Sequence, residues 1–164
     1  MGLFGKKKIT VADATMQFYK SRTTVFLQNE IEAVENIFRT FYEENTPEST
    51  DIVKEVLPAI WALGIEPVRN LWGDATFNRV QREMLGNISF WDSPLDEFFT
   101  ERFLHHTQLW RNGLEMHSTT EQSDFILRKL GKKPNLLTSQ FLSTQLSLFV
   151  GTYWKDLQSK FKLV

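Results

Sequence analysis

The chain of 164 residues contains no cysteine, which excludes disulfide bonds, thiolate metal sites and cysteine nucleophiles together. Its formal net charge is only -1, so it lacks the basic excess that nucleic-acid binders usually carry, and we expect no nucleic-acid partner. The eight glycines form neither a G-x-G-x-x-G pattern nor a P-loop, and there is no G-x-S-x-G motif for a serine nucleophile. These absences favour a protein that is not an enzyme.

Apolar residues recur at helical spacing through most of the chain, and no run alternates with the period of two that is typical of a strand. A hydrophobic fraction of 41%, with 14 phenylalanines and five tryptophans, is sufficient for a packed core. The sequence therefore predicts an all-α protein, with a single domain over residues 10–164 that forms a bundle of about six to eight helices.

The stretch 134–154 contains no charged residue, although charged residues make up 24% of the chain. Its large apolar residues fall on one face of a helix, and Ser143, Ser147 and Gly151 form a second face of small residues. Such a helix is most simply buried on several sides, so we expect the bundle to be built around this buried C-terminal helix. Its many serine, threonine and glutamine residues argue against a membrane span.

Residues 1–9 combine two apolar residues with three cations, namely Leu3, Phe4, Lys6, Lys7 and Lys8. This segment is too short and too polar for a secretory signal, and we expect a flexible basic tail. An apolar pair beside three lysines is also typical of segments that rest on an anionic membrane surface. The sequence therefore predicts a cytoplasmic protein, with peripheral membrane contact through the tail as an alternative.

The apolar residues of segment 27–41 follow steps of four, three, four and three: Leu27, Ile31, Val34, Phe38 and Phe41. This heptad spacing forms a seam suited to a partner helix. A chain of this size ordinarily uses such a seam inside its own fold, and a homodimer is the alternative. We predict an interaction surface made of this seam together with Phe90 and Trp91, an aromatic pair in an expected loop.

Glu97, Glu101 and His105 lie four residues apart on one expected helical face, where two carboxylates and an imidazole would supply part of a metal site. Di-iron bundles, however, use Glu-x-x-His pairs from two helices, and no histidine in this chain has a glutamate three residues before it. We therefore expect a solvated helix face and no bound metal.

A second face of the same segment combines aromatic residues with two histidines: Phe99, Phe103, His106, Trp110 and His117. Histidine on such a face is able to ligate haem iron, and a helical chain of this size has room for haem or an apolar ligand between its helices. Core histidines that hold a hydrogen-bond partner account for the same pattern. We expect no cofactor, and keep this set as the alternative ligand pocket.

In the absence of a chemical motif, the sequence favours a non-enzymatic helical protein–protein interaction module, such as an adaptor, a chaperone-like protein or a regulatory subunit. Its expected partner is another protein or a second copy of the chain. The alternative is a helical sensor or carrier that encloses an apolar ligand or haem.

Overall fold

The computed structural model describes residues 6–89, 94–112 and 115–164, and the side chains of residues 110–118 lie outside this description. Within the described residues the chain forms eight α-helices, one π-helical turn, one 3₁₀ turn and one pair of short strands. The prediction of an all-α, single-domain bundle is therefore confirmed.

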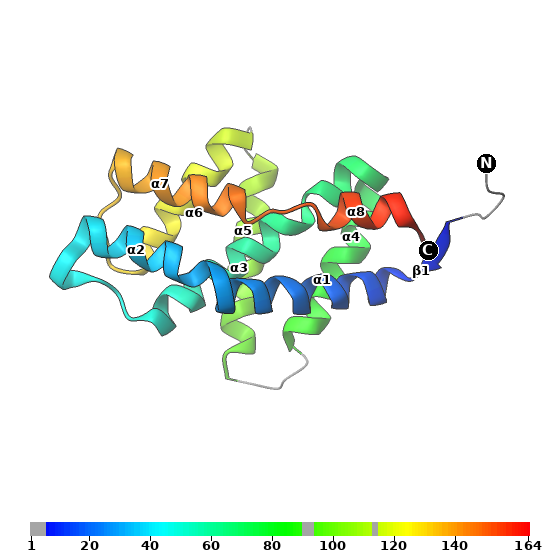
Figure 1. Ribbon diagram of the computed structural model, residues 1–164, viewed down its shortest axis with the longest axis horizontal. Coiled ribbons are helices and arrows are strands. Elements are labelled where there is room, and N and C mark those ends of the chain that lie inside the picture. The colour runs from blue at the N-terminus through cyan, green and yellow to red at the C-terminus, as the bar shows by residue number, and fades with distance from the viewer. Residues whose placement is uncertain (1–5, 90–93, 113–114) are drawn as a thin grey trace.

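The first part of the chain follows the long axis of the molecule and then turns inward (Figure 1). Its elements are β1 (Lys7–Ile9), α1 (Val11–Val25), the π-helical turn η1 (Phe26–Glu30), α2 (Ile31–Tyr42), the 3₁₀ turn η2 (Glu43–Asn45) and α3 (Ser49–Ile65). The hydroxyl of Thr10 accepts a hydrogen bond from the backbone N–H of Asp13 (N···O 3.0 Å), which caps the start of α1.

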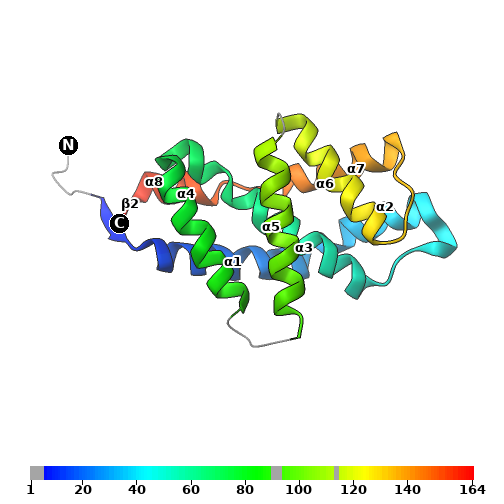
Figure 2. The same cartoon turned by 180° about the vertical axis from the view of Figure 1, so that it is seen from behind.

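The second part of the chain covers both sides of this rod. Its elements are α4 (Pro67–Ile88), α5 (Asp96–Asn112), α6 (Glu115–Lys129), α7 (Leu136–Leu148), α8 (Tyr153–Lys160) and β2 (Phe161–Leu163). Seen from behind, α4 and α5 cross the rod of α1 and α2 at a steep angle (Figure 2). Helices α7 and α8 return along the rod on its other side. Gly73 kinks α4, because its φ of 81° is not helical and is readily adopted only by glycine.

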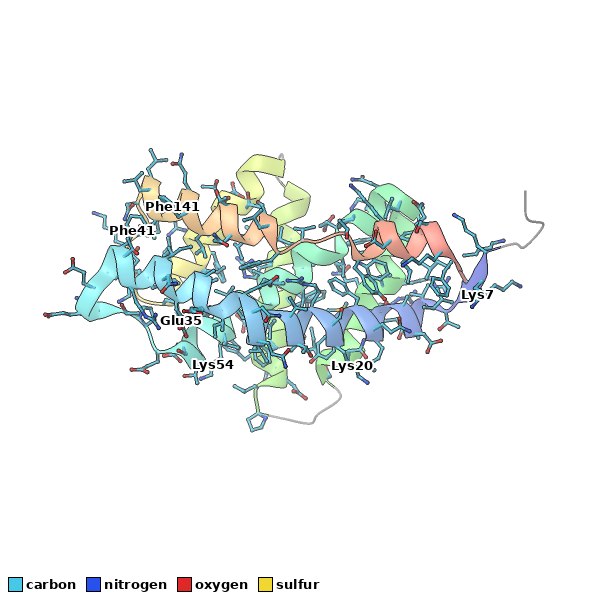
Figure 3. All side chains as sticks on the ribbon, viewed as in Figure 1. Lys7, Lys20, Glu35, Phe41, Lys54 and Phe141 are labelled. Atoms are coloured by element: carbon cyan, nitrogen blue, oxygen red, sulfur yellow. The ribbon has the colours of Figure 1, made fainter. Side chains whose placement is uncertain are left out.

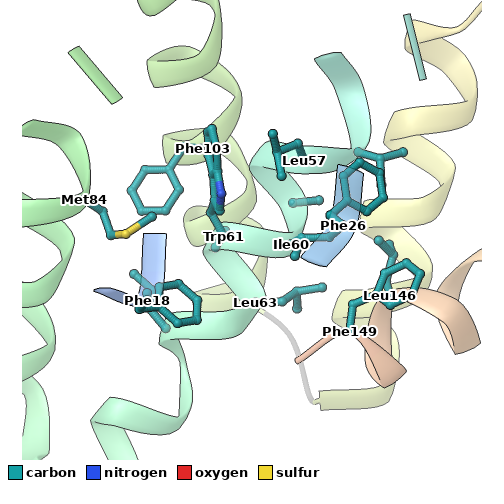
Figure 4. Packing of buried hydrophobic residues seen from close by; sticks show 14 of the residues in the cluster. Phe18, Phe26, Leu57, Ile60, Trp61, Leu63, Met84, Phe103, Leu146 and Phe149 are labelled. Atoms are coloured by element: carbon teal, nitrogen blue, oxygen red, sulfur yellow. The ribbon is translucent and has the colours of Figure 1, made fainter. Parts of the chain in front are cut away.

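The central helix of the bundle is α3. Every residue of α3 from position 56 to position 65 is buried, as expected for a helix segment that is apolar all round. Figure 4 shows Trp61 of α3 beside Phe103 of α5 and Met84 of α4, with Phe18 of α1 on the same side of the helix. The indole N–H of Trp61 donates to the hydroxyl of Thr23 (3.0 Å), so its one polar atom is also paired.

The expectation that the C-terminal uncharged helix is the buried centre of the bundle is wrong. Helix α7 buries Thr138, Ser139, Leu142 and Leu146 on one face, and its opposite face is exposed. The physical reason is that serine, threonine and glutamine are readily hydrated, so the absence of charge in a helix does not require burial. The segment also does not form one long helix, because α7 ends at Leu148 and α8 begins at Tyr153.

Strands β1 and β2 join the two ends of the described chain as a parallel pair, in the register Lys7 to Phe161, Lys8 to Lys162 and Ile9 to Leu163. The backbone N–H of Val11 also donates to the carbonyl of Val164 (3.0 Å). The prediction of a flexible tail is therefore wrong for Lys7–Ile9, and residues 1–5 lie outside the described part of the chain. Strands of three residues are too short to show a period in the sequence.

Candidate interaction surface

Helix α7 carries a group of large apolar side chains that stay exposed: Leu136 (72% exposed), Leu137 (58%), Phe141 (53%) and Leu148 (67%). Leu137, Phe141 and Leu148 are separated by four and seven residues and therefore lie on one side of the helix. Thr144 occupies the remaining position on this side. We call Leu137, Phe141, Thr144 and Leu148 the α7 stripe.

The orientation of α7 is fixed by its cap and by its buried face. The side chain of Asn135 accepts a hydrogen bond from the backbone N–H of Thr138 (3.0 Å), so the first turn has a satisfied donor. The hydroxyl of Ser139 donates to a carboxylate oxygen of Asp124 on α6. Because these contacts and the buried leucines hold the opposite side of the helix, the α7 stripe must face outward.

The α7 stripe borders α2. The rings of Phe41 and Phe141 lie 5.5 Å apart between centroids, and those of Phe26 and Phe149 lie 6.1 Å apart. The start of segment 26–41 thus lies beside the end of segment 141–149, and its end lies beside the start, so the two segments run antiparallel. Figure 3 shows Phe41 and Phe141 together at one end of the elongated molecule. Leu27, which follows Phe26, is 46% exposed.

The predicted heptad seam is used largely inside the fold. Val34 and Phe38 are fully buried, Ile31 and Phe41 are partly buried, and only Leu27 is exposed. The other two members of the predicted surface, Phe90 and Trp91, lie outside the described residues. Sequence reasoning missed the α7 stripe because the uncharged helix was expected to be covered on several sides. The spacing of Leu137, Phe141 and Leu148, at steps of four and seven, was the sequence pattern that indicates a shared helix side.

A buried ion pair connects α5 to the central helix. The guanidinium of Arg102 donates to both carboxylate oxygens of Glu55, with Nε···Oε2 at 2.8 Å and Nη2···Oε1 at 3.3 Å. Its Nη1 donates to Glu101 (2.9 Å), and its Cζ lies 4.6 Å from the ring centre of Phe98. Arg102 therefore has charged partners on two sides. The pair joins residues 47 positions apart, which no local sequence pattern indicates.

His106 lies in the core beside this ion pair. In the described residues neither of its ring nitrogens has a hydrogen-bond partner. Burial, followed by the nearby His105 and Arg102, lowers the pKa of His106 from 6.5 to about 3. The imidazole is therefore neutral at ordinary pH. Its neighbour His105 stacks on Phe125 with 3.9 Å between ring centroids, and burial also lowers the pKa of His105.

On the helix face of Glu97, Glu101 and His105, two of the three side chains have partners within the protein. Glu101 pairs with Arg102, and His105 stacks on an aromatic ring. Among the residues that the structure describes, no group of three or more histidine, aspartate or glutamate side chains is placed to hold a metal ion. Glu97 is exposed at the start of α5.

The alternative ligand pocket is divided between the core and the part of the chain that is not described. Phe103 and His106 are fully buried, and Phe99 packs edge-on against Trp61 with 5.7 Å between ring centroids. The side chains of Trp110 and His117 lie outside the description. A hollow of about 460 Å³ on this flank is lined by His105, Leu109, Glu121, Asp124, Phe125 and Arg128, without His106. Binding of haem or an apolar ligand here stays the alternative to the expectation of no cofactor.

The cations of the predicted membrane-contact segment lie at the opposite end of the molecule from the α7 stripe, where Figure 3 labels Lys7. Lys6, Lys7 and Lys8 are all exposed, and Leu3 and Phe4 lie outside the described residues. None of the described helices has the length and apolar character needed to cross a membrane.

The described residues thus form an all-α bundle in which α7 exposes an apolar face. The sequence matches no protein-family model and no curated protein, and no solved structure matches the chain.

Proposed function

We propose that the protein is a non-enzymatic helical module for protein–protein contact, and that the α7 stripe is its contact face. The observation that carries this proposal is the exposure of Leu137, Phe141 and Leu148 on one side of a capped, well-anchored helix. Single exposed apolar residues are ordinary, but a contiguous apolar group on one element marks an interaction site. Loss of water from these side chains would supply the driving force for association.

A second copy of the chain is the partner that this face fits most simply. The α7 stripe contains no charge, so two copies meet without repulsion between like charges. Twofold antiparallel pairing of two α7 helices would place Leu137 of one copy opposite Leu148 of the other, and Phe141 opposite Thr144. Leucine side chains then pack against each other at both ends of the stripe. Near the twofold axis, the small Thr144 leaves room for the ring of Phe141 from the other copy. Self-complementarity of this kind is what an isologous dimer requires.

The experiment is to measure the mass in solution of the full chain by light scattering over a range of protein concentrations. A dimer would have twice the chain mass of 19.2 kDa. The test variant is Phe141→Asp, which puts two like charges close to the twofold axis. We expect the wild-type chain to form dimers and Phe141→Asp to remain monomeric with its helical circular dichroism unchanged.

The matched control is Leu95→Gln, because Leu95 is also an exposed leucine (39%) but lies just before α5, away from the α7 stripe. This variant should dimerise like the wild-type chain. A wild-type chain that stays monomeric at every concentration would contradict self-association through α7. Equal loss of dimer in both variants would place the interface elsewhere.

A further inference from the structure

The pairing of β1 with β2 gathers lysines from both ends of the chain at one end of the molecule. They are Lys6, Lys7, Lys8, Lys160 and Lys162, and we call them the terminal lysine cluster. All five side chains are exposed. Figure 1 shows this end, with β1 beside the C-terminus, at the far end of the molecule from α2 and α7. The cluster is therefore separate from the contact face proposed above.

The strand register places two of these cations side by side. Lys8 is the partner of Lys162 across the parallel pair, and paired residues of neighbouring strands point to the same side of a sheet. Like charges at directly opposed positions destabilise strand pairing. The structure nevertheless holds both lysines at this position, where an external anion between them would relieve the repulsion.

The lysines of the cluster form no ion pair with the carboxylates in the part of the chain that the structure describes. In the described residues none of the five ammonium groups lies within 4.0 Å of a carboxylate. Asp13 and Asp156 are close to the cluster in the sequence; they accept hydrogen bonds from the hydroxyls of Thr10 (2.7 Å) and Thr152 (2.8 Å) and form no ion pair with these lysines. A chain with a formal net charge of -1 thus carries a locally cationic end.

A hollow of about 540 Å³ opens at the same end of the molecule. Its lining residues are Lys6, Trp72, Gln158, Phe161, Lys162 and Leu163. The ammonium group of Lys6 donates to the backbone carbonyl of Gln158 (2.7 Å), which holds this lysine against α8. The hollow therefore combines two cations with the apolar side chains of a tryptophan, a phenylalanine and a leucine.

We propose that the terminal lysine cluster and this hollow bind the surface of a membrane that contains anionic phospholipid. A phosphate group would meet the ammonium groups, and the apolar lining suits the glycerol and upper acyl region beneath it. Tryptophan is enriched at this depth of a bilayer, because its ring is apolar and its N–H is polar.

A lipid surface suits the cluster better than a nucleic acid does. The cluster contains no arginine, which is the side chain that recognises phosphate and bases with a rigid two-pronged geometry. Lysines act as point charges, and clusters of four to eight basic residues near an apolar anchor are typical of contact with anionic lipid.

The experiment is cosedimentation of the full chain with phosphatidylcholine vesicles, with and without about 30 mol% phosphatidylserine. The test variant is Lys8→Gln/Lys162→Gln, which removes the opposed pair. Each lysine near an anionic surface contributes about fivefold to partitioning, so we expect the double variant to bind roughly 30-fold more weakly. Wild-type binding should require phosphatidylserine and should weaken as the salt concentration rises.

The matched control is Lys20→Gln/Lys133→Gln, which makes the same change in net charge at two exposed lysines outside the cluster. It should bind vesicles like the wild-type chain, and Phe141→Asp should do so as well, so failure of the α7 proposal would not affect this test. Three outcomes would overturn the lipid proposal: equal binding to vesicles without phosphatidylserine, equal loss in both lysine variants, or binding to a short nucleic-acid duplex with no binding to anionic vesicles.

Discussion

The carboxylate of Glu55 receives two hydrogen bonds from the guanidinium of Arg102, at 2.8 and 3.3 Å, at a place where both residues are at most 8% exposed. The two groups fix α5 against the central helix α3. A pair of this kind offsets its own desolvation only while both partners are present, because removal of one leaves a buried, uncompensated charge.

We therefore predict that Arg102→Leu lowers the free energy of unfolding by about 3–5 kcal/mol, and that Glu55→Leu lowers it by less, because Arg102 keeps its hydrogen bond to Glu101 (2.9 Å). The double variant should lose much less than the sum of the two, because it leaves no buried charge without a partner. Urea unfolding of the wild-type chain, the two single variants and the double variant measures the interaction energy between Glu55 and Arg102. Additive single effects would show that the two side chains do not interact in solution.

Gly64 lies inside α3, where the absence of a side chain allows the ring of Phe18 to pack closely against the helix. A Cβ at this position would lie 2.5 Å from Cζ of Phe18, whose ring is fully buried. We predict that Gly64→Ala destabilises the protein by about 1–2 kcal/mol, since the overpacking exceeds the gain of about 1 kcal/mol in helix propensity. The change should appear as a lower midpoint in thermal or urea unfolding.

The control for this substitution is Gly86→Ala on α4, where an added Cβ would meet no atom within 4 Å beyond its chain neighbours and the backbone of its own helix. Only the propensity gain acts there, so Gly86→Ala should stabilise the protein by about 0.5–1 kcal/mol. Stabilisation by both substitutions would mean that the ring of Phe18 moves aside without cost.

The helices could be predicted from the sequence because the spacing of their apolar residues is a local property of the chain. Which helix lies at the centre of the bundle could not be predicted in this way, because that depends on contacts between distant segments. Helix α3 carries the charged Lys54 and Glu55 near its start, so its central position was not visible from composition. The uncharged α7 was expected there instead, although its serine, threonine and glutamine side chains tolerate water. The opposition of Lys8 and Lys162 depends on pairing between the two ends of the chain, which no short pattern encodes.

The buried imidazole of His106 should make stability depend on pH. Its pKa is about 3 in the folded protein and 6.5 ordinarily, so the unfolded chain takes up a proton first as the pH falls. The contribution of the neutral ring is complete above about pH 6.5 and is lost as the pH falls toward about 3. We predict a decrease of about 1.4 kcal/mol in the free energy of unfolding per pH unit in this window from His106.

The comparison is with His106→Phe, which keeps a ring in the core and removes the proton-binding nitrogens. Urea unfolding at a series of pH values should give a shallower slope for this variant, lower by about one proton, whatever its stability at neutral pH. Parallel slopes for the two proteins would mean that His106 is not shielded from solvent as described.

Because the α7 stripe is exposed, we expect truncation of its side chains to have little effect on the free energy of unfolding of the single chain. Leu142 is fully buried and Leu137 is 58% exposed on the same helix, so identical truncations should have different effects. Leu142→Ala should cost about 2–5 kcal/mol through lost burial and the cavity left behind, and Leu137→Ala should change the free energy of unfolding by no more than about 0.5 kcal/mol. The measurement is urea unfolding at a protein concentration low enough to keep the chain monomeric. If Leu137→Ala were as costly as Leu142→Ala under that condition, α7 would be covered on both sides within one chain, and its outer face would not be free to bind a partner.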